Sequence, residues 1–298
     1  MKFGFIIPHN YGLSDPQDVL DVATKAEELG FDSVWVNHHV LHAGYILDRL
    51  GDKPYYDCLT VLTYVAATTK DIGLGTTVLV LPYLNPLVLA KTLATLDVMS
   101  GGRLRVGVGV GALKHESDSL GAQFEGRGRY ADESISVMKA LWTQENPSFE
   151  GEHFNFSGIK FSPKPKQDPH PPILIGGMSR AALRRVARLG DGWHPNGVTP
   201  DGLDKPLGYL GQRLESEGRK LSDIQLSVRN ELSVLDSSDS SPASPMVGTP
   251  DELVGTIEGY AGKGISEMVF QVSTDDVPRI HRTMESFASK VMPRVSRG

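Results

Sequence analysis

Phe3-Gly4-Phe5-Ile6-Ile7 is a short apolar run, and it opens the unit that decides the fold. Asp15-Pro16-Gln17-Asp18 follows, where Asp15 can cap the free backbone N–H groups of a helix and Pro16 needs no donor at the first helical position. Ser33-Val34-Trp35-Val36-Asn37 is a second apolar run. The stretch therefore predicts a strand, a helix and a second strand.

The same alternation continues along the chain. Further apolar runs predict strands within Ile72–Leu81 and at Arg103–Gly109, Ile173–Ile175, Gly192–His194, Ile224–Asn230 and Glu267–Val272. Amphipathic segments predict helices at Cys58–Thr69, Asn85–Ser100, Arg129–Trp142, Ser179–Leu189, Asp204–Glu217 and Val277–Met292, and a capping box at Thr249–Glu252 begins another. About eight strands alternating with helices predict a (β/α)₈ TIM barrel with insertions, in one domain spanning Met1–Gly298. An open doubly wound sheet is the rival, and it accounts less well for eight regular units.

Two segments depart from this alternation. Glu150–Pro165 is β-like and aromatic, which predicts an inserted hairpin or an extended loop. Asp236–Pro245 is rich in Ser, Asp and Pro, which is the composition of a mobile loop.

Composition and charge exclude several classes of protein. The 298 residues include 30 Lys and Arg against 36 Asp and Glu, a formal net charge of −6, so the chain is a poor candidate for binding nucleic acid or an anionic membrane. The single Cys58 excludes an internal disulfide and a cysteine-based zinc cage. No apolar run has the length of a membrane span, and the strand-like start differs from a signal peptide. We therefore expect a cytoplasmic protein that acts on a small-molecule substrate.

In a (β/α)₈ barrel the active site lies at the carboxyl ends of the strands, and this rule selects candidate residues. The expected strand ends carry many histidines and other polar residues: Pro8, His9, Asn10, Asn37, His38, His39, Thr76, Thr77, His194, Asn196, Arg229, Asn230 and Glu231. Two aromatic segments, Val40–Tyr56 and Phe149–Phe161, are expected to shape the pocket. Their aromatic side chains indicate a largely apolar substrate, unless they only pack the insertions.

The histidines His38, His39 and His42 raise the question of a metal site. Adjacent residues on a strand point to opposite faces, so His38 and His39 cannot both bind one metal while the strand continues. Carboxylates are also sparse at the other strand ends. We therefore predict no metal site and favour proton transfer by one of these histidines, whose side chains titrate near neutral pH.

Two glycine clusters follow strands. Gly107, Gly109 and Gly111 allow either the close approach of a flat or phosphorylated ligand or tight packing within the barrel, and the sequence favours neither. Gly176-Gly177-Met178-Ser179 joins a strand to a helix N-terminus, where free N–H groups and the helix dipole favour an anion. There we predict a phosphate site rather than a plain turn.

Several longer motifs, taken in order, resemble one known family. The motifs on which the resemblance rests are Ala26-Glu27-Glu28-Leu29-Gly30-Phe31-Asp32-Ser33-Val34-Trp35, Gly75-Thr76-Thr77-Val78, Leu96-Asp97-Val98-Met99-Ser100-Gly101-Gly102-Arg103, Val106-Gly107-Val108-Gly109, Pro172-Ile173-Leu174-Ile175-Gly176-Gly177 and Gly190-Asp191-Gly192-Trp193. Together they resemble the bacterial luciferase-like superfamily of flavin- and deazaflavin-dependent oxidoreductases, which are (β/α)₈ barrels. Two stretches, Leu79-Val80-Leu81-Pro82-Tyr83 and Gly102-Arg103, are most similar to the branch that uses coenzyme F420.

The resemblance implies roles for particular residues. His39 takes the family's histidine position beside the reactive ring, and His38 stands where the family usually has an acidic residue. Thr77-Val78 matches a non-proline cis peptide bond that backs the ring. Gly109 and Gly111 match the family's backbone positions near the ribityl or phosphate part of the cofactor. The segment Gly176, Gly177, Met178 and Ser179 matches the family's phosphate-binding site. Some F420 enzymes have an acidic residue at the position of Ala112; Glu116 lies further on, in a position that favours a structural role.

The resemblance implies an F420-dependent oxidoreductase that transfers a hydride between the deazaflavin and a small organic substrate. His39 is the candidate acid or base, and His9 is a second contact. Three alternatives remain: an FMN-dependent monooxygenase that uses O₂, a cofactor-binding protein without turnover, and a metal-dependent barrel hydrolase. Family members are often homodimers, and the apolar faces of Leu59–Ala67 and Leu87–Leu96 are compatible with such pairing.

Overall fold

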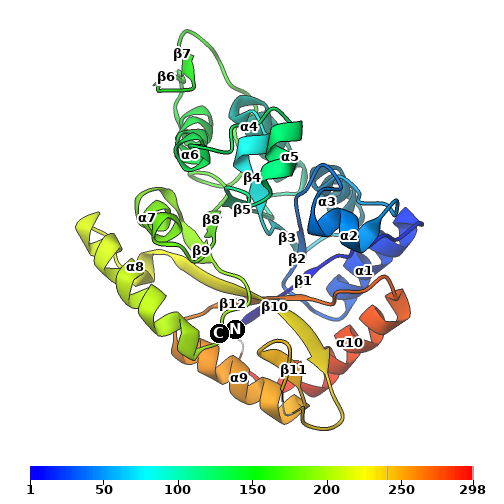
Figure 1. Ribbon diagram of the computed structural model, residues 1–298. Coiled ribbons are helices and arrows are strands. Elements are labelled where there is room, and N and C mark those ends of the chain that lie inside the picture. Colours follow the sequence, from blue (N-terminus) through cyan, green and yellow to red (C-terminus); the bar gives the residue numbers. More distant parts are fainter. Residues whose placement is uncertain (240, 297–298) are drawn as a thin grey trace.

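The computed structural model describes residues 1–239 and 241–296, and within them eight parallel strands close into a barrel (Figure 1). In chain order these are β1 (Lys2–Ile6), β2 (Ser33–Val36), β3 (Gly73–Thr76), β5 (Leu104–Gly109), β8 (Ile173–Gly176), β9 (Gly192–His194), β10 (Gln225–Val234) and β12 (Glu267–Gln271). Pairing of Gln225 with Gly192 and of Leu226 with Trp193 joins β10 to β9 and closes the ring. The predicted (β/α)₈ barrel is confirmed, and the open sheet is wrong.

Helices surround this barrel (Figure 1). They are α1 (Pro16–Glu28), α2 (Tyr45–Leu50), α3 (Cys58–Thr68), α4 (Pro86–Met99), α5 (Lys114–Ser119), α6 (Arg127–Thr143), α7 (Arg180–Leu189), α8 (Asp204–Ser216), α9 (Pro250–Gly262) and α10 (Val277–Lys290). The sequence pattern did not predict α2 and α5. Each has six residues and lacks a side-chain cap, so neither shows the stripe or the start signal on which such predictions depend.

The third predicted strand differs from the structure in its length. Within Ile72–Leu81, β3 ends at Thr76, and a separate two-residue strand, β4 (Leu79–Val80), pairs with β5. The 3₁₀ turn η1 (Leu81–Tyr83) follows. The break falls at the cis peptide bond between Thr77 and Val78, where the chain changes direction.

The inserted segments lie outside the ring of strands. β6 (Phe149–Glu150) and β7 (Asn155–Phe156) form the predicted hairpin, which projects away from the barrel in Figure 1. β11 (Met246–Gly248) pairs with the end of β10. The predicted loop Asp236–Pro245 contains bends and turns, and its Ser240 lies outside the described residues.

Trp35 fills the centre of the barrel, and two glycines make room for its indole ring. A Cβ atom at Gly75 would lie 2.3 Å from the Trp35 ring, and one at Gly4 would lie 2.5 Å from its Nε1. Ile6, Leu174 and Val269 complete this buried cluster. Below it, Arg105 pairs with Glu267, which also accepts a hydrogen bond from Ser33. These residues begin or adjoin the amino ends of their strands, so the polar cluster occupies that end and the opposite end is available for a site.

The described helices include none that is long and apolar enough to cross a bilayer.

Candidate active site

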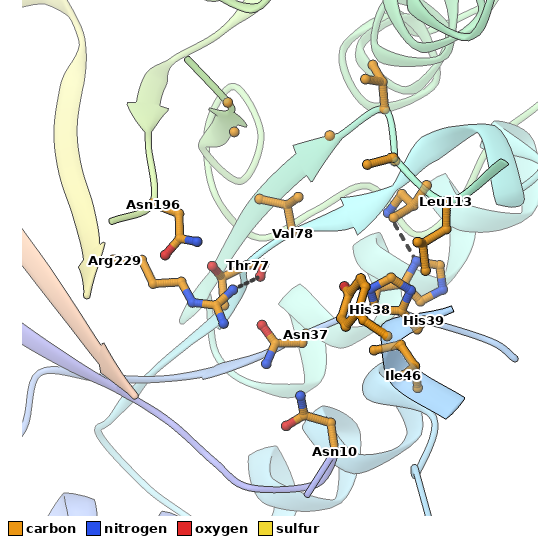
Figure 2. A pocket seen from close by; sticks show the side chains of 18 of the residues that line it. Asn10, Asn37, His38, His39, Ile46, Thr77, Val78, Leu113, Asn196 and Arg229 are labelled. Carbon is orange, nitrogen blue, oxygen red and sulfur yellow. Dashed lines mark hydrogen bonds between the residues drawn. The ribbon is translucent and has the colours of Figure 1, made fainter. Parts of the chain in front are cut away.

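A cavity of about 470 Å³ opens at the carboxyl ends of the strands, where (β/α)₈ barrels place their active sites (Figure 2). Its walls come from most of the barrel: Asn10, Tyr11, Asn37, His38, His39, Tyr45, Ile46, Arg49, Thr77, Val78, Val80, Gly109, Val110, Gly111, Ala112, Leu113, Gly176, Gly177, His194, Asn196, Arg229 and Gln271. The cavity thus brings together seven of the predicted site residues: His39, Thr77, Val78, Gly109, Gly111, Gly176 and Gly177.

His39 is held from both sides of its ring. Its Nδ1 lies 2.7 Å from Oε2 of Glu116 on α5, and the hydroxyl of Tyr45 on α2 lies 2.9 Å from its Nε2. Glu116 is fully buried and also accepts hydrogen bonds from the backbone N–H groups of Val40 and Leu41. Burial alone would raise the pKa of Glu116. The hydrogen bonds have the larger combined effect, that from His39 being the strongest of them, and they lower the pKa of Glu116 below 4.5. Glu116 is therefore an ionised acceptor at neutral pH.

This pairing fixes the tautomer of His39. Because an ionised carboxylate only accepts hydrogen bonds, Nδ1 of His39 carries the proton and donates a hydrogen bond to Glu116. In the neutral ring Nε2 then has a free electron pair, which accepts a hydrogen bond from Tyr45. The arrangement leaves His39 able to take up or release a proton at Nε2.

His38 also lines the cavity. His38 and His39 were expected on opposite faces of a continuing strand, but β2 ends at Val36 and residues 37–39 belong to no strand. His38 is buried, and its Nδ1 accepts a hydrogen bond from the backbone N–H of Val80 at 3.0 Å. Burial lowers the pKa of His38 to about 4, so the ring is neutral at neutral pH.

The peptide bond between Thr77 and Val78 is cis, as the family resemblance implies. The Val78 side chain occupies the space that side chains at two glycines would need. A Cβ atom at Gly109 would lie 2.7 Å from Val78 Cγ2, and one at Gly176 would lie 3.0 Å from Val78 Cγ1. The glycines therefore serve close packing around Val78, while their backbone remains exposed to the cavity.

The start of α7 matches the predicted phosphate site in its local geometry. Gly177 has φ +100°, which favours glycine, and the Ser179 hydroxyl caps the helix by accepting the N–H of Ala182 at 3.1 Å. Met178 is 38% exposed. Met178 and Ser179 lie beside the cavity wall formed by Gly176 and Gly177 and do not themselves line it.

His9 does not reach the cavity. Its ring is fully buried, and its two nitrogens lie 3.1 Å and 3.0 Å from the carbonyl oxygens of Ile7 and Asn37. Burial lowers its pKa. His9 therefore supports the wall that carries Asn37.

His194 forms part of the cavity floor. Its ring stacks on Trp35, with ring centroids 5.2 Å apart, and its nitrogens lie 2.9 Å from Thr77 Oγ1 and 2.7 Å from Ser227 Oγ. Burial lowers the pKa of His194 to about 3, so it stays neutral. His194 links the barrel core to the residue that precedes the cis bond.

The strand-end rule selects Asn10, Asn37 and Arg229, and all three line the cavity. The segment Val40–Tyr56 is expected to shape the pocket, and its residues Tyr45, Ile46 and Arg49 do line it, although the helix α2 that carries them was not predicted. Sequence reasoning missed Gln271, whose place at the end of β12 was the signal that could have selected it. Conversely, no residue of Phe149–Phe161 lines the cavity, so the expectation that this aromatic insertion shapes the pocket is wrong.

No group of three or more potential metal-binding side chains occurs among residues 1–239 and 241–296. His39 uses Nδ1 for Glu116, and His42 Nδ1 bonds the carbonyl of Gly51. His38, His39 and His42 therefore each bond a different partner.

With this geometry in place, comparison with known proteins identifies the family. The model of the luciferase-like monooxygenase family matches residues 1–243. The chain belongs to this family, which confirms the resemblance found in its motifs.

Two relatives show that similar chains use different cofactors. An F420-dependent glucose-6-phosphate dehydrogenase of Amycolatopsis mediterranei (strain U-32) is 30% identical over 231 residues, 73% of this chain and 65% of the relative. An FMNH₂-dependent dimethylsulfone monooxygenase of Pseudomonas putida is 34% identical over 200 residues, 66% of this chain and 53% of the relative. This chain thus spans less than two thirds of the length of either relative.

Solved structures share the fold over nearly the whole chain. Monooxygenase RslO1 from Streptomyces bottropensis has a TM-score of 0.85 at 24% identity, covering 99% of this chain and 100% of the other. An F420-dependent secondary alcohol dehydrogenase has a TM-score of 0.81 at 21% identity, covering 99% of both chains.

Proposed function

We propose that this protein is an F420-dependent oxidoreductase that transfers a hydride between the deazaflavin and a small organic substrate. The observation that carries the proposal is His39, held at the cavity between the buried carboxylate of Glu116 and the hydroxyl of Tyr45. Oxidation of an alcohol by hydride loss releases a proton, and reduction of a carbonyl consumes one. A positioned histidine meets this need.

The cavity has features that suit such a cofactor. Gly109, Gly111, Gly176 and Gly177 present backbone rather than side chains to it, which allows a flat ring to approach closely. Asn37 lines it with both polar atoms of its amide buried and without a hydrogen-bond partner. The N–H groups of Arg180 and Ala181, which precede the capped Ala182, have no acceptor within the helix and would hold the cofactor phosphate. When bound, the cofactor would supply the hydride transfer itself.

The chain's own residues would manage the proton and the orientation. His39 would hold or release the proton at Nε2, and Glu116 would keep its ring in the required tautomer. Thr77 and His194 would support the wall beneath the substrate.

An FMN-dependent monooxygenase is the second candidate. Its support is the 34% identity to the FMNH₂-dependent dimethylsulfone monooxygenase, which exceeds the 30% identity to the F420-dependent relative from Amycolatopsis. The same cavity and helix terminus would hold FMN. The carboxylate-oriented histidine favours hydride transfer, and it also favours turnover over mere cofactor storage.

A parallel titration with oxidised F420 and FMN, followed by fluorescence, tests the proposal. We expect saturable binding of F420 and affinity for FMN at least about tenfold weaker, a difference of about 1.4 kcal/mol. Preference for FMN would favour the monooxygenase. Binding of neither cofactor would refute both candidates.

A matched pair of variants at Ser179 tests the phosphate site. Ser179→Asp and Ser179→Asn both retain a side-chain oxygen that caps α7, and only Asp adds a negative charge. We expect Ser179→Asp to weaken cofactor binding by about tenfold or more and Ser179→Asn to change it by less than about threefold. Equal effects of the two variants would place the phosphate elsewhere.

We propose further that the protein is a cytoplasmic homodimer joined through α3 and α4. The described surface of α3 includes Tyr64, which is 58% exposed, and α4 exposes Val88 at 66%. Cys58–Thr68 contains no charged residue, although a surface helix ordinarily has a polar face. A second copy of the chain would cover these side chains.

A further inference from the structure

The guanidinium group of Arg229 projects from β10 into the cavity. Its Nη1 donates to the carbonyl oxygen of Thr77 at 3.2 Å, and its Nη2 donates to Oε1 of Gln271. In Figure 2 this side chain lies near Thr77, and its end points toward the same space as Asn37 and Asn10. Arg229 is therefore fixed in place by two neutral acceptors.

Arg229 uses fewer donors than Arg103 and, unlike Arg185 and Arg105, has no carboxylate partner among the described residues. A guanidinium has five N–H donors. Arg103 directs its donors to four carbonyl oxygens and the Thr69 hydroxyl, while Arg185 and Arg105 each pair with a carboxylate. Arg229 makes only the two hydrogen bonds above within the described chain, so three N–H donors have no protein acceptor there.

Arg229 also forms no ion pair within the described chain. Neither Asp nor Glu occurs among the residues that line the cavity, whereas Arg49 adds a second positive charge. The neighbouring carboxylate of Glu231 accepts hydrogen bonds from the N–H and hydroxyl of Ser273 and acts on Arg229 only through its charge, without a hydrogen bond between them. Burial lowers the pKa of Arg229. A chain with net charge −6 thus carries a positive cavity.

Unpaired amides surround the same space. Oδ1 of Asn10 and both Oδ1 and Nδ2 of Asn37 are buried without a hydrogen-bond partner in the described structure. Asn10 is 4% exposed and Asn37 is 7% exposed, so water does not compensate them freely. Buried polar groups without partners are costly, and a ligand oxygen would satisfy Nδ2 of Asn37 by accepting its hydrogen bond.

We propose that Arg229, with the amide nitrogen Nδ2 of Asn37, binds an anionic oxygen group of the substrate, so that the substrates are small carboxylates, sulfonates or phosphate esters. This inference rests on the proposed function, because it names the reactant of the same site. It replaces the largely apolar substrate expected from the sequence. The helix terminus of α7 remains for the cofactor phosphate, so the chain provides two separate places for negative charge.

Methanesulfonate and dimethyl sulfone are matched probes, because they have similar size and shape and only the first is charged. Each is titrated by calorimetry into the cofactor-free protein and into protein saturated with whichever cofactor binds. We expect saturable methanesulfonate binding in both states, at least about tenfold tighter than dimethyl sulfone. Equal binding of the two probes, or no methanesulfonate binding, overturns the proposal.

Variants locate the charge that is responsible. We expect Arg229→Gln to weaken methanesulfonate binding by about tenfold or more, Arg229→Lys to weaken it less, and Arg49→Gln to change it by less than about threefold. Equal losses in Arg229→Gln and Arg49→Gln would indicate a diffuse positive field and overturn the assignment. If Arg229→Gln fails to fold, Arg229→Lys and the charge preference of the native protein still decide the matter.

The cofactor-saturated arm separates the substrate from the cofactor as the source of the anion. Release of methanesulfonate by the cofactor, or equal loss of cofactor binding in Arg229→Gln, would assign Arg229 to the cofactor and overturn the proposal. If the proposed function is wrong but the anion site is right, the binding experiments give a different result. Neither F420 nor FMN would bind, while methanesulfonate binding to the cofactor-free protein would still depend on Arg229.

Discussion

His38 stands where the resemblance to luciferase-like proteins predicts an acidic residue, and the structure shows how the chain accommodates the change. The His38 ring accepts a hydrogen bond from Val80 and is buried. The carboxylate that faces His39 comes instead from Glu116, on a different element. The acid–histidine pair is thus present in space although it is absent from the local sequence.

The lowered pKa of His38 predicts that stability depends on pH. Its pKa is about 4 in the folded protein against 6.5 in the unfolded chain, so the unfolded chain takes up this proton first as the pH falls. The contribution is complete above the unfolded value and is lost progressively as the pH drops toward the folded value. From pH 7 to pH 4 the folded state should lose about 3 kcal/mol through His38 alone.

The variant His38→Asn isolates this contribution, because an amide oxygen can still accept the Val80 N–H and does not titrate. Urea unfolding at several pH values should show the wild type losing about 3 kcal/mol more than His38→Asn between pH 7 and pH 4. His194 and His9 contribute equally to both proteins. Parallel curves for the two proteins would contradict the assignment.

At the level of elements, the contact between β3 and β5 positions the cavity wall. The Thr76 hydroxyl donates to the Gly107 carbonyl at 2.8 Å, and a Cβ atom at Gly107 would lie 1.9 Å from the Thr76 carbonyl oxygen. The obstacle is backbone, so it cannot move aside as a flexible side chain would. The spacing of these strands therefore requires glycine at this position.

Gly107→Ala and Gly208→Ala form a matched pair that tests this requirement. We expect Gly107→Ala to lower the free energy of unfolding by about 3 kcal/mol or more, because two strands must separate. Gly208 lies exposed in α8 with nothing within 4 Å of an added Cβ, so Gly208→Ala should raise stability by about 0.5–1 kcal/mol. Urea denaturation at neutral pH measures both, and similar small effects would show that the strands can yield.

At the level of the whole molecule, a groove between α1 and α3 accompanies the exposed apolar side chains of the proposed dimer face. Leu20, Leu59, Val61 and Tyr64 are among the residues that line it. Contiguous apolar surface of this kind is typical of protein interfaces. The groove lies on the outside of the helix layer, separate from the cavity at the strand ends.

Sedimentation velocity tests the dimer. We expect the native protein to sediment as a dimer and Tyr64→Glu to shift it to monomer by placing a charge in the buried interface. Ile159→Glu is the control, because Ile159 is 36% exposed, lies outside α3 and α4 and does not line the groove. A monomeric native protein, or equal dissociation by both variants, would contradict the proposed interface.

The sequence by itself determined the barrel and much of its active end. Apolar runs, helix caps and glycine stops are local signals, so strands and helices from β1 to α10 were predicted near their observed positions. The rule that sites lie at strand ends then selected Asn37, His39 and Arg229 before their contacts were known. Motif order supplied the family and the position of the cis bond between Thr77 and Val78.

Only the tertiary structure decided how these residues act. Glu116 is 77 positions from His39, and Gln271 is 42 positions from Arg229, so no local pattern could join them. The position of His9 at a strand end predicted that it would line the cavity. The tertiary structure instead buries its ring against the carbonyl groups of Ile7 and Asn37. Side-chain direction, burial and the count of unused donors follow from closure of the barrel, because closure brings distant strand ends together and excludes water between them.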